Sequence, residues 1–145
     1  MGIDSPKLWS PDSPVLYYLH SLIIKDDEII DSTITPFGIR EIQLDKDKGF
    51  LLNGEAIKMK GVNIYDDAGC VGVAVSDRVL ERRLERLKGI GCNAIRTSHN
   101  PPASELLDMC DRMGFLVLDE AFDPRNPWFD VVENDYVIGQ FLRKY

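Results

Sequence analysis

From residue 60 onward the sequence alternates between short apolar runs and longer amphipathic segments, and this alternation limits the possible folds most. Strand-like runs occur at 60–64, 93–95 and 115–118. Helices are expected over 77–90 and from Ser104 to Met113. The run at 115–118 is apolar throughout, which is typical of a parallel strand buried on both faces. The order β-α-β-α-β therefore predicts an α/β fold with a parallel sheet.

The expected helices carry start and stop signals. Ser76 and Ser104 are predicted N-caps, and Gly91 and Gly114 are predicted stops. The first helix has an apolar stripe at three- and four-residue spacing: Leu80, Leu84 and Leu87, widened by Val79 and Ile90.

The charges of the first helix predict a solvated face. Basic and acidic residues alternate there: Arg82, Arg83, Arg86 and Lys88 with Asp77, Glu81 and Glu85. The formal net charge of the chain is −7, and its basic residues form no single block. This pattern argues against a nucleic-acid partner. No apolar run reaches the ~20 residues of a membrane span, so no membrane partner is expected.

The three cysteines are Cys70, Cys92 and Cys110. Their odd number and spacing argue against a disulfide framework or a zinc site. We interpret them as small core residues, and we expect no metal and no cofactor.

Before residue 60 the sequence reads as β structure. Strands are expected at 15–19, 21–24, 34–40 and 41–44, and again on either side of Asn53-Gly54. That dipeptide predicts a type I′ hairpin, because both central residues of such a turn need a positive φ. After residue 124 the apolar residues from Trp128 to Phe141 favour a helix, but Gly139 weakens that interpretation.

A polar cluster follows the strand at 93–95. It runs Arg96-Thr97-Ser98-His99-Asn100 and is stopped by two prolines. Ligands of α/β folds bind beyond the carboxyl ends of the strands, so this cluster is the first candidate for a binding site.

Several ordered motifs resemble those of the family 2 glycoside hydrolases, which include β-galactosidases and β-glucuronidases. The matching stretches, in chain order, are Leu8-Trp9-Ser10-Pro11, Leu16-Tyr17, Phe37-Gly38-Ile39-Arg40, Leu52-Asn53-Gly54, Lys60-Gly61-Val62-Asn63, residues 93–101, residues 110–114 and Val117-Leu118-Asp119-Glu120-Ala121. The resemblance implies that residues 1–48 are the C-terminal part of an immunoglobulin-like β-sandwich. Residues 49–145 would be the N-terminal part of a (β/α)8 barrel, with three parallel strands.

The resemblance also implies a retaining β-glycosidase that acts on a β-galactoside or a related sugar. Such enzymes need two carboxyl groups ~5–5.5 Å apart. In the family these are glutamates of the fourth and seventh barrel strands, so we expect no catalytic residue in this chain and no hydrolysis by the chain alone. Asp119 and Glu120 are poor substitutes, because adjacent strand residues point to opposite faces.

The residues expected to bind substrate are Arg96, His99, Asn100, Tyr65, Asp67 and Glu120. Each also has a purely structural interpretation. Arg96 orients the nucleophile or forms an ion pair with Glu120, and Asn100 binds hydroxyls or makes the turn before Pro101. The loop with Tyr65 and Asp67, where relatives often carry histidine, contacts substrate or only solvent.

Two further predictions concern partners. A partial barrel leaves strand edges unpaired, so we expect homo-oligomers. The alternative to an enzyme is a non-catalytic carbohydrate-binding or interaction module, which the β-rich first half and the polar cluster also suit.

Overall fold

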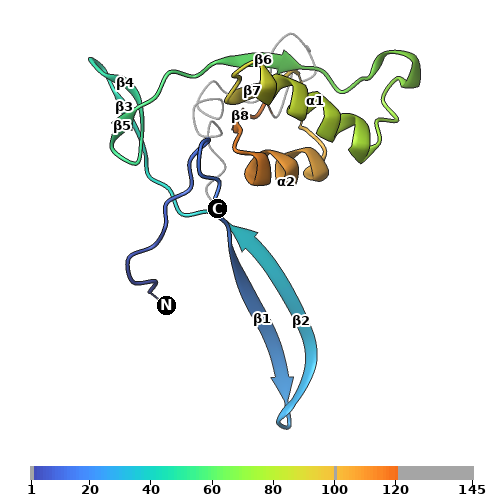
Figure 1. Ribbon diagram of the computed structural model, residues 1–145. Helices are drawn as coiled ribbons and strands as arrows, with labels where there is room; N and C mark the ends of the chain where they lie inside the picture. The colour runs from blue at the N-terminus through green and yellow to red at the C-terminus, as the bar shows by residue number, and fades with distance from the viewer. Residues whose placement is uncertain (1, 100, 121–145) are drawn as a thin grey trace, which may run out of the picture. The chain divides into compact units, whose positions relative to one another are not determined.

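The computed structural model describes residues 2–99 and 101–120 and divides into two compact units between Ile57 and Lys58 (Figure 1). Each unit is described by itself. Asn100 and the predicted helix after Trp128 lie outside the described residues. The domain boundary expected between residues 48 and 49 stays a prediction.

The first unit contains a long antiparallel hairpin of β1 (Tyr17–Lys25) and β2 (Glu28–Phe37). Asp26 and Asp27 form the turn with φ values of 51° and 63°. The two strands expected at 15–19 and 21–24 are thus one strand. The strand expected from residue 34 begins earlier, at Glu28, because pairing with β1 overrides the low strand propensity of Asp31 and Ser32.

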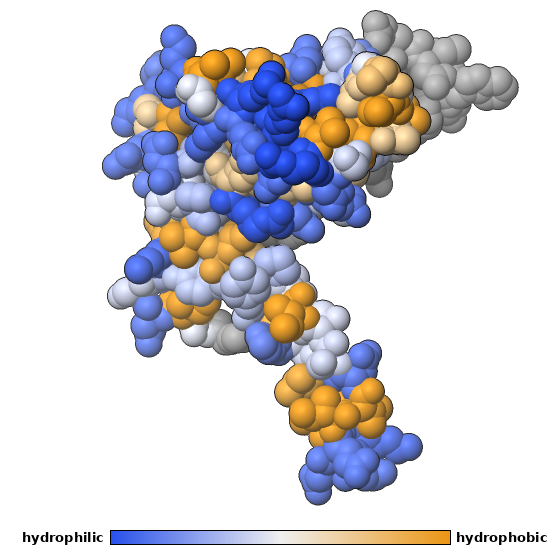
Figure 2. All heavy atoms as spheres, turned by 45° about the vertical axis from the view of Figure 1, so that its right-hand side comes forward, coloured by the Kyte–Doolittle hydropathy of each residue, from blue (hydrophilic) through white to orange (hydrophobic). Residues whose placement is uncertain are grey.

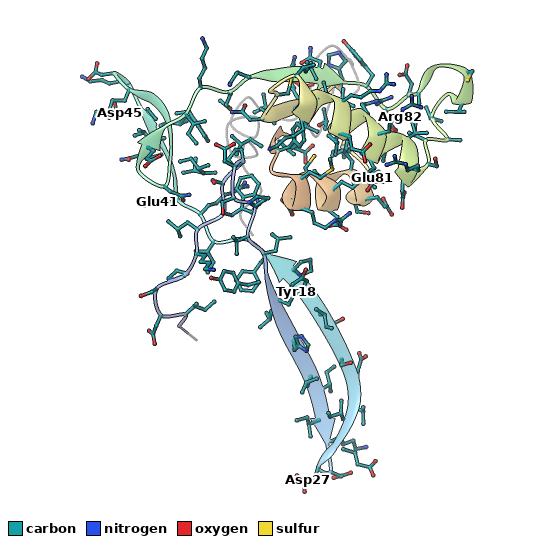
Figure 3. All side chains as sticks on the ribbon, in the orientation of Figure 1. Tyr18, Asp27, Glu41, Asp45, Glu81 and Arg82 are labelled. Carbon is teal, nitrogen blue, oxygen red and sulfur yellow. The ribbon has the colours of Figure 1, made fainter. Side chains whose placement is uncertain are left out.

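The hairpin exposes apolar side chains on both strands. Figure 2 shows these residues as an orange band above the hydrophilic tip, and Figure 3 labels Tyr18 and the tip residue Asp27. The most exposed aliphatic residues are Leu22, Ile23, Ile24, Ile29, Ile30 and Ile34, each between 49% and 62% exposed. Within its unit the hairpin forms a sheet of two strands only, so both outer edges lack ladder partners among the described residues.

A second sheet in the same unit consists of β3 (Ile42–Asp45), β4 (Gly49–Leu52) and β5 (Glu55–Ala56). Asn53 and Gly54 connect β4 to β5 with φ values of 53° and 82°, which confirms the predicted hairpin turn. The Asn53 side chain also accepts a hydrogen bond from the Glu41 amide (2.9 Å) and donates one to the Trp9 carbonyl (3.0 Å).

Trp9 is the centre of this unit's core and is 1% exposed. Its amide donates to the Ile39 carbonyl at 2.7 Å, and the Arg40 guanidinium lies 4.7 Å from the ring centroid. A Cβ at Gly38 would come within 3.1 Å of the Trp9 side chain. The two motifs around Trp9 and Gly38 therefore pack on each other.

The second unit has a parallel sheet in the order β6 (Gly61–Ile64), β7 (Ala94–Thr97) and β8 (Leu116–Leu118). Its helices are α1 (Asp77–Gly89) and α2 (Ser104–Met113), and a short 3-10 turn spans Gly69–Val71. The predicted β-α-β-α-β order is confirmed.

The register separates the two faces of the parallel sheet. The face that packs with both helices in one apolar cluster carries Val62, Ile64, Ile95 and Val117. On the opposite face Asn63, Arg96 and Leu118 occupy one register row. Arg96 and the apolar core thus lie on different faces of the same strands.

Several expectations about the helices are wrong in detail. Ser76 is the N-cap of α1, as expected, although its side chain makes no cap hydrogen bond, whereas Ala103 rather than Ser104 is the N-cap of α2. Val79 and Ile90 are 38% and 77% exposed rather than part of the stripe, because Ile90 follows the last helical residue. Gly114 ends α2 in the left-handed conformation, as expected.

The three cysteines differ in their burial. Cys110 is fully buried, and burial raises the pKa of its thiol to about 12. Cys92 packs partly against the same cluster. Cys70 is exposed, so its prediction as a core residue is wrong. It lies in the short 3-10 turn between β6 and α1, and none of the residues of this turn is buried.

Candidate functional site

The candidate site lies just beyond the carboxyl ends of β7 and β8, where Glu120 comes between Arg96 and His99. The guanidinium of Arg96 donates to Oε1 of Glu120 from Nε at 2.6 Å and also from Nη2. The Nδ1 atom of His99 lies 3.3 Å from the other carboxylate oxygen, Oε2. Arg96 thus holds one oxygen of Glu120 and leaves the second oxygen beside the imidazole.

Three polar atoms at this end of the sheet are buried and have no hydrogen-bond partner among the described residues: Ser98 Oγ, His99 Nδ1 and Glu120 Oε2. Buried polar atoms are nearly always paired, so such a group calls for an explanation. A ligand hydroxyl can donate to the carboxylate and accept from or donate to the imidazole. The side chains are still reachable, since His99 is 27% and Glu120 is 18% exposed.

Thr97 connects the two strand ends at this site. Its hydroxyl accepts a hydrogen bond from the Glu120 amide at 3.2 Å and donates to Asp119 Oδ1 at 3.4 Å. Thr97 is 4% exposed. The backbone that carries Glu120 is therefore fixed relative to β7, and so are the carboxylate and Arg96.

The loop between β6 and α1 brings Tyr65 to the same place. The Tyr65 ring lies edge-on to the His99 imidazole, with the centroids 6.0 Å apart and the planes at 63°. The carbonyls of Tyr65 and Asp67 accept hydrogen bonds from the Arg83 guanidinium at 3.5 Å and 2.5 Å. One side chain of α1 thus contacts the backbone of the loop at two points.

A cavity of about 180 Å³ lies between this loop, α1, the end of β7 and the start of α2. Its polar lining includes Tyr65, Asp66, Arg83, Thr97 and Ser98. Aliphatic residues of the core cluster, such as Ile64, Leu80 and Leu106, form part of the rest. Ser98 contributes to its wall, whereas Arg96, His99 and Glu120 do not. The cavity and the Arg96–Glu120–His99 cluster therefore share the strand end and its loop.

The structure brings together four of the six residues expected to bind substrate. Arg96, His99 and Glu120 form one cluster, and Tyr65 contacts His99. The side chain of Asp67 is exposed, and its carbonyl is the group that meets Arg83. Asn100 lies outside the described residues. The binding roles themselves stay predictions.

Thr97 and Arg83 contribute to the geometry in ways that the sequence did not predict, because Thr97 bonds the Glu120 backbone and Arg83 bonds the loop after β6. Arg83 was interpreted as part of a solvated face, which is wrong for this residue because it bonds the loop. The same interpretation is wrong for Lys88, whose ammonium donates to the Gly114 carbonyl at 3.0 Å. A usable signal was the position of Arg83 beside the apolar stripe, whereas Arg82 lies opposite it at 3.6 residues per turn.

The described residues contain no group of three or more His, Cys, Asp or Glu side chains placed to hold a metal ion. Within the same part of the chain, no helix has the length and apolar character needed to cross a membrane.

Comparison with known proteins identifies the family. A family model described as "Glycosyl hydrolases family 2, TIM barrel domain" matches residues 42–124, and a second one, "Glycosyl hydrolases family 2", matches residues 1–40. The chain therefore belongs to the family 2 glycosyl hydrolases. It combines part of the family's sandwich domain with three parallel strands of its TIM barrel.

Individual relatives carry two kinds of name. "Beta-galactosidase BoGH2A" of Bacteroides ovatus is 54% identical over 123 residues, which are 85% of this chain and 14% of that protein. A "Putative beta-glucuronidase" of Formosa agariphila is 42% identical over 136 residues, 94% of this chain and 13% of that protein. The chain thus spans about a seventh of these relatives.

Solved structures agree with the fold. A crystal structure of a family 2 member from Bacteroides cellulosilyticus matches with a TM-score of 0.79 and 48% identity, over 82% of this chain and 15% of that one. The β-glucuronidase of Parabacteroides merdae matches with a TM-score of 0.77 and 30% identity, over the same shares.

Proposed function

We propose that this chain is part of a retaining β-glycosidase that hydrolyses terminal β-linked sugars. The observation that carries the proposal is the arrangement at the carboxyl ends of β7 and β8. There Arg96 holds one oxygen of Glu120, while the other oxygen and His99 Nδ1 are buried without hydrogen-bond partners among the described residues. Membership of the family supports the reaction class.

In this proposal His99 and Glu120 bind sugar hydroxyls, and Arg96 fixes the carboxylate by a charge-assisted hydrogen bond. The ring of Tyr65 packs edge-on against the His99 imidazole and forms one side of the sugar site. Asp67 and Asn100 complete the set as further hydrogen-bonding residues. These side chains hold and orient the sugar and do not break the glycosidic bond.

The bond is broken by two glutamates that we place elsewhere in the parent protein. One protonates the leaving oxygen, and the other attacks the anomeric carbon to give a covalent glycosyl-enzyme. The small share of the relatives that this chain spans supports that division. We therefore propose that the 145-residue chain hydrolyses nothing by itself.

For the sugar we propose a β-galactoside. The support is the 54% identity to a protein named β-galactosidase, against 42% to one named putative β-glucuronidase. We place the choice of sugar in the Tyr65-Asp66-Asp67 loop, because Tyr65 of this loop contacts His99.

The test compares two proteins on two substrates. A longer polypeptide that carries this chain and the complete barrel is expected to release nitrophenol from 4-nitrophenyl β-galactoside faster than from the β-glucuronide. The 145-residue chain is the control and is expected to release none. Hydrolysis by the control would contradict the division of roles. Binding of sugars by the longer polypeptide without any hydrolysis would favour a carbohydrate-binding module instead.

We also propose that the chain forms homo-oligomers through the β1–β2 hairpin. Its apolar side chains are half exposed or more, and its two outer edges lack ladder partners among the described residues. A second copy offers the same edge and the same apolar side chains, so two hairpins can pair. Light scattering across a concentration series is expected to show dimers, and a monomer at every concentration would contradict this.

A further inference from the structure

We propose that Arg83 of α1 is a positioning residue of the sugar site, an inference that rests on the proposed function. Arg83 holds the backbone of the loop after β6, and that backbone holds the Tyr65 ring against His99. Arg83 itself contacts no residue of the Arg96–Glu120–His99 cluster by any hydrogen bond or ion pair in the described part of the chain.

The hydrogen bonds of the loop point to this role. Within residues 65–75 the loop makes its own bonds, such as Ala68 N–H to the Gly72 carbonyl at 2.9 Å. Among the described residues, the hydrogen bonds that join this segment to the rest of the unit both come from Arg83. Removing them leaves the loop attached only through the chain and through packing.

Packing alone gives the loop limited support. A cavity of about 180 Å³ separates loop residues from α1, the end of β7 and α2. The loop also exposes its apolar side chains, with Val71 47% and Val73 76% exposed. Segments with few buried contacts open most easily, so the two bonds of Arg83 contribute much of the loop's order.

The connection to the site passes through one residue. The carbonyl of Tyr65 accepts one of the Arg83 bonds, and the ring of the same residue lies edge-on to His99. Tyr65 is 52% exposed, so its ring orientation depends on its backbone more than on a surrounding core. A displaced loop would release the imidazole whose Nδ1 atom faces Glu120.

The chain offers a matched control in the adjacent Arg82. Figure 3 labels Arg82 on α1 next to Glu81. Arg82 is exposed, whereas Arg83 is half-buried. Replacing either arginine by glutamine removes one charge from the same helix, but only Arg83→Gln removes the two bonds to the loop.

The first experiment uses the full chain and the ring signals of His99 in NMR spectra. Tyr65→Leu defines the signal of His99 without the aromatic contact. We expect Arg83→Gln to move the His99 signals in that direction, Arg83→Lys to move them partway because one donor can be kept, and Arg82→Gln to leave them unchanged. Unchanged signals in Arg83→Gln, or equal changes in Arg82→Gln, would overturn the proposal.

Two further outcomes are also decisive. If Arg83→Gln fails to fold, Arg83→Lys decides the matter by the same comparison. If neither variant folds, Arg83 is a residue of the fold alone and the proposal fails.

The second experiment measures hydrolysis by the longer polypeptide. Arg83→Gln is expected to raise KM about fivefold with little change in kcat, because it loosens sugar binding and touches no reacting atom. Arg82→Gln is expected to change neither constant. If the unmodified polypeptide hydrolyses no glycoside, the proposed function fails, while the His99 signals still decide whether Arg83 positions Tyr65.

Discussion

The two ends of the parallel sheet use polar side chains in opposite ways. At the amino end the Asn93 carboxamide accepts from the Lys60 amide at 2.7 Å and donates to the Lys58 carbonyl at 3.1 Å. At the carboxyl end His99 Nδ1 and Glu120 Oε2 are buried without a hydrogen-bond partner in the described part of the chain. The amino end satisfies its polar groups internally, whereas at the carboxyl end these two atoms lie 3.3 Å from each other without a hydrogen bond, and we propose that a ligand satisfies them.

This difference has an energetic meaning. A buried polar group without a partner costs about 1–3 kcal/mol, and a fold that needed only stability would avoid it. In the proposed site, a sugar hydroxyl that reached His99 and Glu120 would recover that free energy as binding. In TIM barrels the carboxyl ends carry function and the amino ends carry stability, and the comparison follows that rule.

The largest expected effect is that of Glu120→Gln on hydrolysis by the longer polypeptide. The variant loses the charged partner of Arg96 and the acceptor beside His99. We expect kcat/KM to fall about 100-fold, in the range seen when a charge-assisted hydrogen bond is lost. Glu105→Gln, at an exposed position of α2, is the control. A loss of less than about threefold is no larger than the effect of one weak hydrogen bond, and it would show that Glu120 is not part of the sugar site.

The next effect concerns stability at the amino end. A Cβ on Gly61 would lie 2.9 Å from the Ala94 carbonyl oxygen, on the neighbouring strand. Gly61→Ala is therefore expected to lower the free energy of unfolding by about 1–3 kcal/mol in urea titrations of the chain. Gly89→Ala is the matched control, because nothing lies within 4 Å of its Cβ position. It should raise stability by about 0.5–1 kcal/mol, and equal effects of the two substitutions would contradict the close approach of β6 and β7.

A smaller effect is expected for Asn93→Ala. The substitution removes two hydrogen bonds to a partly exposed backbone, so the free energy of unfolding should fall by about 1–2 kcal/mol. Chemical denaturation of the chain measures this loss. A neutral result would mean that the amino end is not held by this side chain.

The smallest effect comes from Cys110, which lies in the core at neither end. Burial raises the pKa of its thiol to about 12 from its ordinary value of 9.0, so the unfolded chain loses this proton first as pH rises. The contribution of the neutral Cys110 thiol to the free energy of unfolding should therefore be fully present below pH 9 and decline above it. Between pH 8 and pH 10 the unfolding free energy of the wild type should fall about 1 kcal/mol more than that of Cys110→Ala. Parallel pH profiles of the two proteins would contradict this.

The sequence predicted what depends on local pattern and on order along the chain. The parallel strands, both helices and the Asn53-Gly54 turn follow from periodicity and turn chemistry, and they are confirmed. The juxtaposition of Arg96 and Glu120 followed from neighbouring strands, and the ion pair between them is present.

What failed depends on contacts between distant segments. The partners of Arg83 could not be predicted, because they are the carbonyls of Tyr65 and Asp67 in a loop that precedes the helix. Cys70 looked like a core residue because composition says nothing about which loop is covered. The first half of β2 contains Asp31 and Ser32, which disfavour a strand, and its extent is set by pairing with β1.

The most direct test of the two-ended sheet is one paired measurement on the longer polypeptide. Both kcat/KM for the β-galactoside and the free energy of unfolding are measured for His99→Asn and Asn93→Ala. We predict that His99→Asn lowers kcat/KM at least about tenfold and changes the free energy of unfolding by less than about 1 kcal/mol. Asn93→Ala is predicted to lower the free energy of unfolding by about 1–2 kcal/mol and to leave kcat/KM nearly unchanged. If His99→Asn instead lowers stability and leaves kcat/KM intact, the carboxyl end is structural and the assignment of the sugar site is wrong.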